Sequence, residues 1–131
     1  MPLHRCSFSR LPGRYAIVRL APGDGLPRSV LDALSFVSVT RTRDELSIVC
    51  DEAVAPAGAR TERGWEVLKL HGPFALDDVG ILVSCAAPLA EHGVSIFTIS
   101  TFETDYILVR TEQADTAVAV LQAAGHSLAG E

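Results

Sequence analysis

The sequence lacks the features that mark nucleic-acid-binding and membrane proteins. Its 131 residues include 11 Lys and Arg against 16 Asp and Glu, and the two signs are interspersed. Phosphate backbones attract a basic stripe, which is missing here, so nucleic-acid binding is not expected. No apolar run reaches the length that spans a bilayer, and the N-terminal segment lacks the continuous apolar core of a signal peptide. We therefore expect a cytoplasmic protein without membrane contact.

Motifs for metals, cofactors and catalysis are also missing. Cys6, Cys50 and Cys85 form an odd set without paired spacing, and the four histidines are scattered. Cys50 lies in a β-like run and Cys85 on the apolar side of an expected helix, so both are predicted to be small buried hydrophobic residues. The glycines after the first strand match no phosphate-binding motif, and no serine has a G-x-S-x-G setting. We expect no metal, no cofactor and no enzymatic activity.

The first half of the chain predicts the order β-α-β-β. Tyr15–Leu20 is rich in β-formers, and Pro27–Leu34 has the apolar spacing of a two-turn helix. Strands are then expected over Phe36–Thr42 and Leu46–Asp51, followed by a surface loop over residues 52–64. The segment Leu3–Ser9 alternates weakly and fits either an edge strand or a frayed terminus.

The second half predicts a strand, a helix, a hairpin and a last helix. The strand is Trp65–His71, which could close the first half or open the second, and we assign it to the second. The central helix follows Gly80, with Asp77 or Asp78 expected as its N-cap and Pro88 expected to kink or split it. The remaining elements are strands at Val94–Thr101 and Asp105–Arg110, a helix at Glu112–Ala124 and a short strand at His126–Leu128.

Two short segments carry residues suited to ligand binding. The strand-to-helix turn Asp77, Asp78, Val79, Gly80 and Ile81 presents the free amides of a helix start, which attract anions, unless Asp78 caps them. The hairpin segment places an aromatic between acids, which suits an ammonium or guanidinium group, unless the ring folds back on the core. Its candidate residues are Ser100, Thr101, Phe102, Glu103 and Asp105.

The same region resembles a known family. The pattern GIL, APLA and then G-x-S-I-F-x-I-S-T-F-x-T-D-Y-x-L-V, from Gly80 to Val109, is similar to ACT domains of the CASTOR type, which include arginine sensors and relatives of the aspartokinase regulatory region. The resemblance runs from Trp65 to the end of the chain, and S-T-F-x-x-D is its most specific part. It implies an α+β, ferredoxin-like β-α-β-β-α-β fold of two ACT-like units packed together. We expect these units at residues 1–63, where the unit is incomplete or borrows a strand, and 64–131.

The resemblance also implies a function. ACT-domain proteins of this type bind a free amino acid at an interface between units and regulate a separate protein, commonly as homodimers. The aromatic and aspartate that help to hold the ligand in arginine sensors correspond here to Phe102 and Asp105. The acids of the hairpin favour a cationic amino acid, and a neutral one remains open. The alternative is a dimerisation or interaction module of the same fold that binds no ligand.

Overall fold

The computed structural model describes residues 4–75 and 77–129. The chain forms two compact units, and it passes from one unit to the other twice. One joins the segment up to Pro12 to the chain from Glu66 onward and is called the C-terminal unit, and the other, Gly13–Trp65, is called the inserted unit. A single boundary between the two units, between residues 63 and 64, was predicted from the sequence. None of the helices in the described ranges combines the length and apolar character needed to cross a bilayer.

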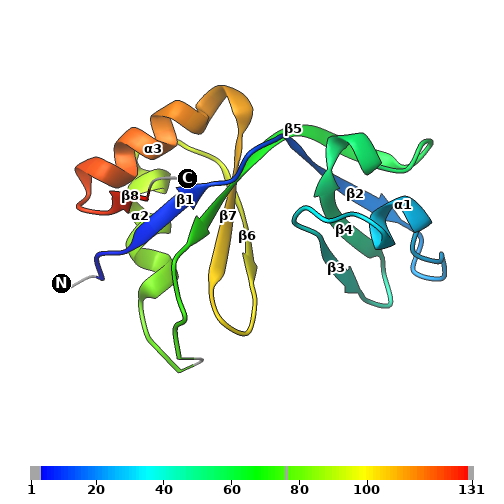
Figure 1. Cartoon of the computed structure of the whole chain (residues 1–131), viewed down its shortest axis with the longest axis horizontal. Helices are drawn as coiled ribbons and strands as arrows, with labels where there is room; N and C mark the ends of the chain where they lie inside the picture. Colours follow the sequence, from blue (N-terminus) through cyan, green and yellow to red (C-terminus); the bar gives the residue numbers. More distant parts are fainter. Residues whose placement is uncertain (1–3, 76, 130–131) are drawn as a thin grey trace. The chain divides into compact units, whose positions relative to one another are not determined.

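The inserted unit is a small sheet with one short helix (Figure 1). Its strands have the order β3-β4-β2-β5, and β2 pairs antiparallel with β4. The predicted helix is reduced to a single turn, α1. The elements are β2 (Tyr15–Leu20), α1 (Arg28–Leu31), β3 (Ser38–Arg41), β4 (Leu46–Asp51), a 3-10 turn (Glu52–Val54) and the first part of β5 (Arg60–Leu70). The apolar core of this unit is formed by Ala16, Val18, Val30, Leu46, Ile48 and Cys50.

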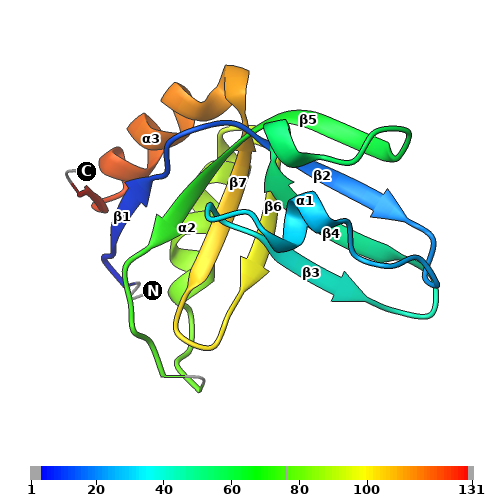
Figure 2. The same ribbon diagram turned by 45° about the vertical axis from the view of Figure 1, so that its right-hand side comes forward.

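The C-terminal unit is a five-stranded sheet covered on one face by two helices (Figure 2). Its strand order is β6-β7-β5-β1-β8, with β6 and β7 forming the predicted antiparallel hairpin. The elements are β1 (Ser7–Arg10), the second part of β5, α2 (Ile81–Glu91), β6 (Ile96–Ser100), β7 (Asp105–Arg110), a 3-10 turn (Thr111–Gln113), α3 (Ala114–Ala123) and β8 (Ser127–Leu128). The α+β, ferredoxin-like prediction is confirmed.

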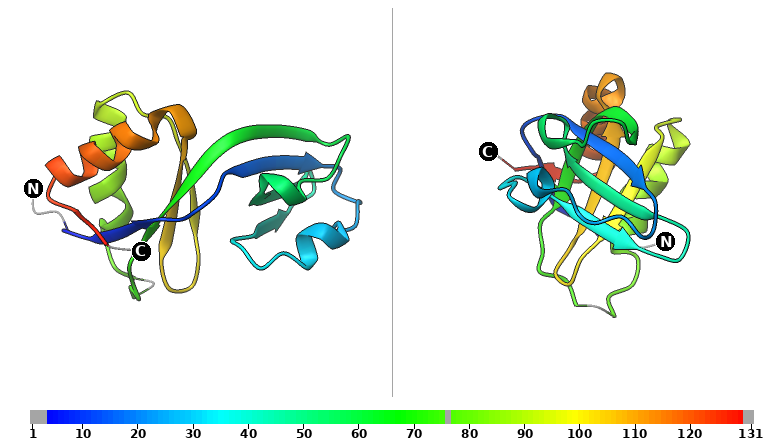
Figure 3. Two further views of the ribbon diagram at one scale, coloured as in Figure 1. Left: turned by 45° about the horizontal axis from the view of Figure 1, so that its top comes forward. Right: turned by 90° about the vertical axis from the view of Figure 1, so that its right-hand side faces the viewer.

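The N-terminal strand β1 is an internal strand of this sheet. It pairs antiparallel with β5 and parallel with β8 (Figure 3). Phe8 therefore lies opposite both Leu70 and Leu128. Phe8 is fully buried and belongs to the same core as α2 and α3. Of the two interpretations of Leu3–Ser9, the strand is correct from Ser7 onward, whereas Leu3 lies outside the described residues. β8, and not β1, forms that edge of the described sheet.

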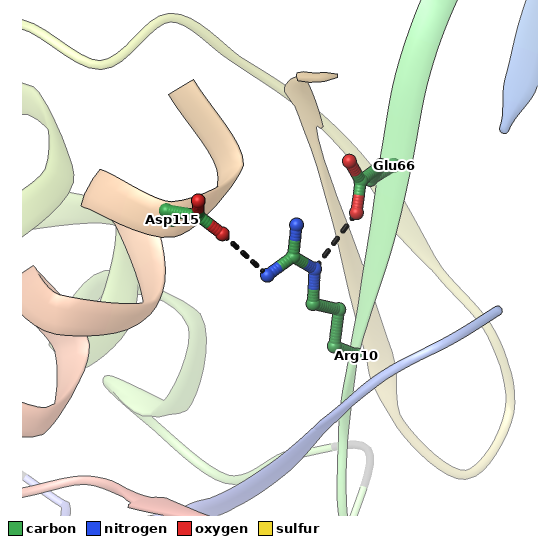
Figure 4. Close-up of polar contacts among 3 residues, drawn as sticks. All are labelled: Arg10, Glu66 and Asp115. Carbon is green, nitrogen blue, oxygen red and sulfur yellow. Dashed lines mark hydrogen bonds and ion pairs between the residues drawn. The ribbon is translucent and has the colours of Figure 1, made fainter. Parts of the chain in front are cut away.

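Arg10 fastens the end of β1 to two other elements (Figure 4). Its Nε donates to Glu66 Oε1 at 2.8 Å, and its terminal nitrogen donates to Asp115 Oδ1, also at 2.8 Å. These hydrogen bonds, with that to Glu66 the larger cause, raise the pKa of the guanidinium. Asp115 is exposed and Glu66 is mostly buried, so we expect the bond between β1 and β5 to contribute more than the bond to α3.

A kink or a split was predicted at Pro88, and the structure shows that α2 continues through this residue without a split. Proline has no N–H, so the Ser84 carbonyl four residues earlier loses its helical donor. His126 replaces that donor: its Nε2 lies 2.9 Å from the Ser84 oxygen, and its Nδ1 accepts from the Cys6 amide at 3.0 Å. These two partners require a neutral imidazole that carries its proton on Nε2. Buried His126 thus ties α2 to the start of β1.

We predict that His126→Phe lowers the free energy of unfolding by about 2–5 kcal/mol, because it leaves the Ser84 carbonyl and the Cys6 amide buried and unpaired. Pro88→Ala restores an N–H that can reach the same carbonyl. The cost of His126→Phe should therefore be about 1 kcal/mol smaller in the Pro88→Ala background. Urea unfolding of the four proteins in this double-mutant cycle measures the difference, and equal costs in both backgrounds would contradict the pairing.

Candidate functional site

A hollow of about 440 Å³ lies in the C-terminal unit, between the start of α2 and the loop that joins β6 to β7. We call it the α2 pocket. Every residue singled out from the sequence except Asp77 lines it, so the two predicted segments come together in space. Its lining is Phe74, Ala75, Asp78, Val79, Gly80, Ile81, Leu82, Val83, Ser100, Thr101, Phe102, Glu103, Thr104 and Asp105.

The helix start differs from the prediction. The N-cap of α2 is Gly80, which has a left-handed φ of 85° and no side chain with which to cap the first amides. Asp78 does not cap the helix, because its carboxylate accepts from the amide of Ala75 at 2.9 Å and so closes a turn before it. The first-turn amides of a helix have no partner within the helix. At the edge of the α2 pocket they therefore provide a place for an anionic group.

His4 holds the turn that leads into α2. Its Nε2 lies 2.8 Å from the Val79 carbonyl oxygen, and its backbone amide donates to Ser84 Oγ at 3.0 Å. Ser84 Oγ in turn donates to the Gly80 carbonyl at 2.6 Å. The N-terminal segment therefore supports one wall of the pocket, a contact that the sequence pattern did not indicate because about 75 residues separate the partners.

The opposite wall supplies acidic and aromatic groups. Asp105, at the start of β7, accepts a short hydrogen bond from Ser100 Oγ, and Glu103 is exposed in the loop. Phe102 has 77% of its surface exposed, so it does not fold back on the core of the described chain. Together with Asp78, these acids give the pocket three carboxylates, and no lysine, arginine or histidine is among its described lining residues. The wall suits a cationic group.

The β6–β7 loop is fixed at its base by backbone contacts. Thr101 N–H donates to the Thr104 carbonyl at 2.8 Å, and Thr104 Oγ1 donates to the Leu70 carbonyl at 2.6 Å. The Phe74 amide donates to the Glu103 carbonyl at 2.8 Å. Gly72 permits this approach, since a Cβ at that position would lie 2.6 Å from the Glu103 oxygen. Phe74 and Thr104 were not predicted as site residues, because nothing in the local sequence distinguishes them from ordinary loop residues.

A second group of side chains could in principle hold a metal. Cys6, Cys85 and His126 place their ligand atoms within 4.8 Å of one another, although they are far apart in sequence. His126 already uses both ring nitrogens. Burial raises the pKa of the Cys6 thiol, and it raises the pKa of the Cys85 thiol to about 12. A metal requires thiolates and a free imidazole lone pair, so these residues do not fit one. All three cysteines are buried, as predicted for Cys50 and Cys85.

Comparison with known proteins places this site in a recognised domain. Residues 60–123 match the family model of the ACT domain, and residues 13–57 match a second family model, which is described as an N-terminal domain. The crystal structure of an Agobacterium tumefaciens protein from structural genomics is 42% identical. The alignment covers 98% of this chain and 95% of that one, with a TM-score of 0.90.

Two further matches are named as an arginine sensor and as a regulatory subunit. The human cytosolic arginine sensor for mTORC1 subunit 1 is 33% identical over 97 residues, which cover 66% of this chain. The chain spans 30% of the length of that relative. The regulatory subunit of aspartate kinase from Thermus thermophilus is 12% identical with a TM-score of 0.59, covering 86% of this chain and 93% of that one, which shows a shared fold.

We predict that Gly72→Ala lowers the free energy of unfolding by about 1–3 kcal/mol, since the added methyl group must push the Glu103 carbonyl away from Phe74 N–H. Gly23→Ala is the matched control, because a Cβ there meets no described atom within 4 Å. It should change stability by less than about 0.5 kcal/mol. Urea unfolding gives both values. Equal effects of the two substitutions would show that the loop does not depend on this close approach.

Proposed function

We propose that this chain, of which residues 60–123 match the family model of the ACT domain, is a regulatory protein that binds a free amino acid in the α2 pocket. The observation that carries the proposal is the pairing of opposite chemistries in one hollow. An uncapped helix start faces a wall with two carboxylates, Glu103 and Asp105, and Asp78 adds a third beside the helix start. The first suits the α-carboxylate of an amino acid and the second suits its ammonium group or a cationic side chain.

A cationic amino acid is the ligand class that we favour. The α2 pocket has a volume of about 440 Å³ and contains an exposed aromatic ring, Phe102, on which a guanidinium or ammonium group can stack. Asp105 is fixed by Ser100, so its carboxylate is already oriented. The name of the curated relative, an arginine sensor, agrees with this choice. A neutral amino acid is the second candidate, because the helix start alone can bind its carboxylate.

In the proposed mechanism the ligand shifts a conformational equilibrium. It bridges Val79–Ile81 and the Phe102–Asp105 segment, and so stabilises the arrangement in which these two walls are close. Val79, Val83 and Phe102 are exposed apolar residues at the pocket, and β6 is an edge strand of the described sheet. A second copy of the chain, paired through this edge, would detect the change.

We also propose that the inserted unit is a second ACT-like unit, on the basis of its strand order.

The first test is a thermal-shift screen against the twenty amino acids. A ligand at a hundredfold excess over its dissociation constant adds about 3 kcal/mol of stability, which should raise the melting temperature by several degrees. Asp105→Asn keeps the size of the side chain and removes its charge, and should abolish the shift. Asp115→Asn removes an exposed acid on α3 and should leave the shift unchanged.

The outcome also separates sensing from the alternative function. If no amino acid raises the melting temperature of the folded protein, the amino-acid proposal fails. The ligand-free interaction module would then be favoured by self-association that is independent of added amino acids, measured by sedimentation equilibrium. A shift that survives in Asp105→Asn would place the ligand elsewhere in the chain.

A further inference from the structure

A second hollow shares the β6–β7 loop with the α2 pocket. Its volume is about 310 Å³, and we call it the β5 pocket. Both hollows are lined by Thr101, Phe102, Glu103 and Thr104. The remaining lining of the β5 pocket comes from the end of β5, from the turn that follows it and from β7, namely Lys69, His71, Gly72, Pro73 and Tyr106.

The β5 pocket contains a basic pair that the α2 pocket lacks. Lys69 is the only lysine in the sequence, and its ammonium group makes no ion pair or hydrogen bond with the part of the chain that the structure describes. His71 lies two residues further on, so its side chain points to the same face of the extended chain. His71 Nε2 makes a short hydrogen bond with Ser9 Oγ, which fixes the ring and leaves Nδ1 for another partner.

The position of this pair is unusual for a chain with a net charge of −5. Glu103 lines both hollows, but the other acids of the site, Asp78 and Asp105, line only the α2 pocket. The β6–β7 loop thus lines both the α2 pocket, which has three carboxylates, and the β5 pocket, which has the basic side chains of Lys69 and His71. The loop is held in place here by two contacts: Thr104 Oγ1 donates a hydrogen bond to the Leu70 carbonyl, and Gly72 lies against the Glu103 carbonyl.

We propose that the β5 pocket is a second binding site, which takes the oxyanion of a small molecule on Lys69 and His71. A carboxylate or a phosphate group has the shared chemistry, because both present oxygens that accept charge-assisted hydrogen bonds. Lys69 supplies a charge that forms no ion pair with the described residues, although Glu103 lines the same hollow, and the ring of His71, held by Ser9, supplies a donor beside it. The hollow is large enough for a metabolite of a few heavy atoms. This proposal does not rest on the proposal that an amino acid binds in the α2 pocket.

The single lysine makes a direct test possible. Protein labelled only with ¹⁵N-lysine gives one backbone amide signal, that of Lys69, which can be followed without further assignment. The protein is titrated with inorganic phosphate and, separately, with acetate, at constant pH and with chloride adjusted to hold the ionic strength. We expect a saturable movement of the signal with at least one of the two anions. Phosphate alone or acetate alone would identify the preferred oxyanion.

Two variants separate a specific site from general charge attraction. His71→Asn should weaken the anion affinity about tenfold, because one charge-assisted donor is lost. Arg5→Met removes a positive charge beside Gly125 and should leave the affinity within about twofold. A linear, non-saturating movement with both anions would overturn the proposal. Equal affinities in wild type and His71→Asn, or equal losses in both variants, would also overturn it.

Discussion

The C-terminal unit depends on a strand that comes from the other end of its sequence. β1 lies between β5 and β8, and residues 4–10 also contact both helices: Cys6 N–H binds His126 after α3, and His4 binds the turn before α2. Bringing such distant segments together costs loop-closure entropy, which the contacts at the junction must offset. The buried Phe8, the paired His126 and the Arg10–Glu66 bond are the groups that provide this stabilisation.

The candidate site depends on the same long-range contacts. Its helix wall begins at Gly80, whose conformation leaves the first amides of α2 without a cap, and the turn before it is held by His4. Its other wall is the β6–β7 loop, which is held by Leu70 and Phe74 on either side of Gly72. Neither wall is held by its own hairpin or helix alone. The pocket is therefore a product of tertiary contacts within the C-terminal unit, although its lining residues lie in two short segments.

This arrangement explains which features could be predicted from the sequence. The strands Tyr15–Leu20, Leu46–Asp51 and Asp105–Arg110 have strong local patterns, and the structure has them at the predicted bounds. Nine of the fourteen lining residues of the α2 pocket were singled out because they lie together in two short segments, whereas others, such as Phe74 and Thr104, were not. The long-range pairings were not predicted: four residues of β1 carry too little pattern to specify two neighbours, and nothing local relates Pro88 to His126. Arg60 to Glu62 are polar, so the early start of β5 was not apparent.

The contrast between the base and the tip of the β6–β7 loop suggests how binding could be transmitted. The base is bound to Leu70 and Phe74, whereas Phe102 at the tip is mostly exposed and lines both hollows. A group that binds in either hollow can therefore reorient the tip without moving the base. Val79 and Val83 are exposed on the α2 side of the same pocket. Under the proposed function, the surface next to the site is apolar, which is the property that a partner needs in order to distinguish the occupied state from the empty one.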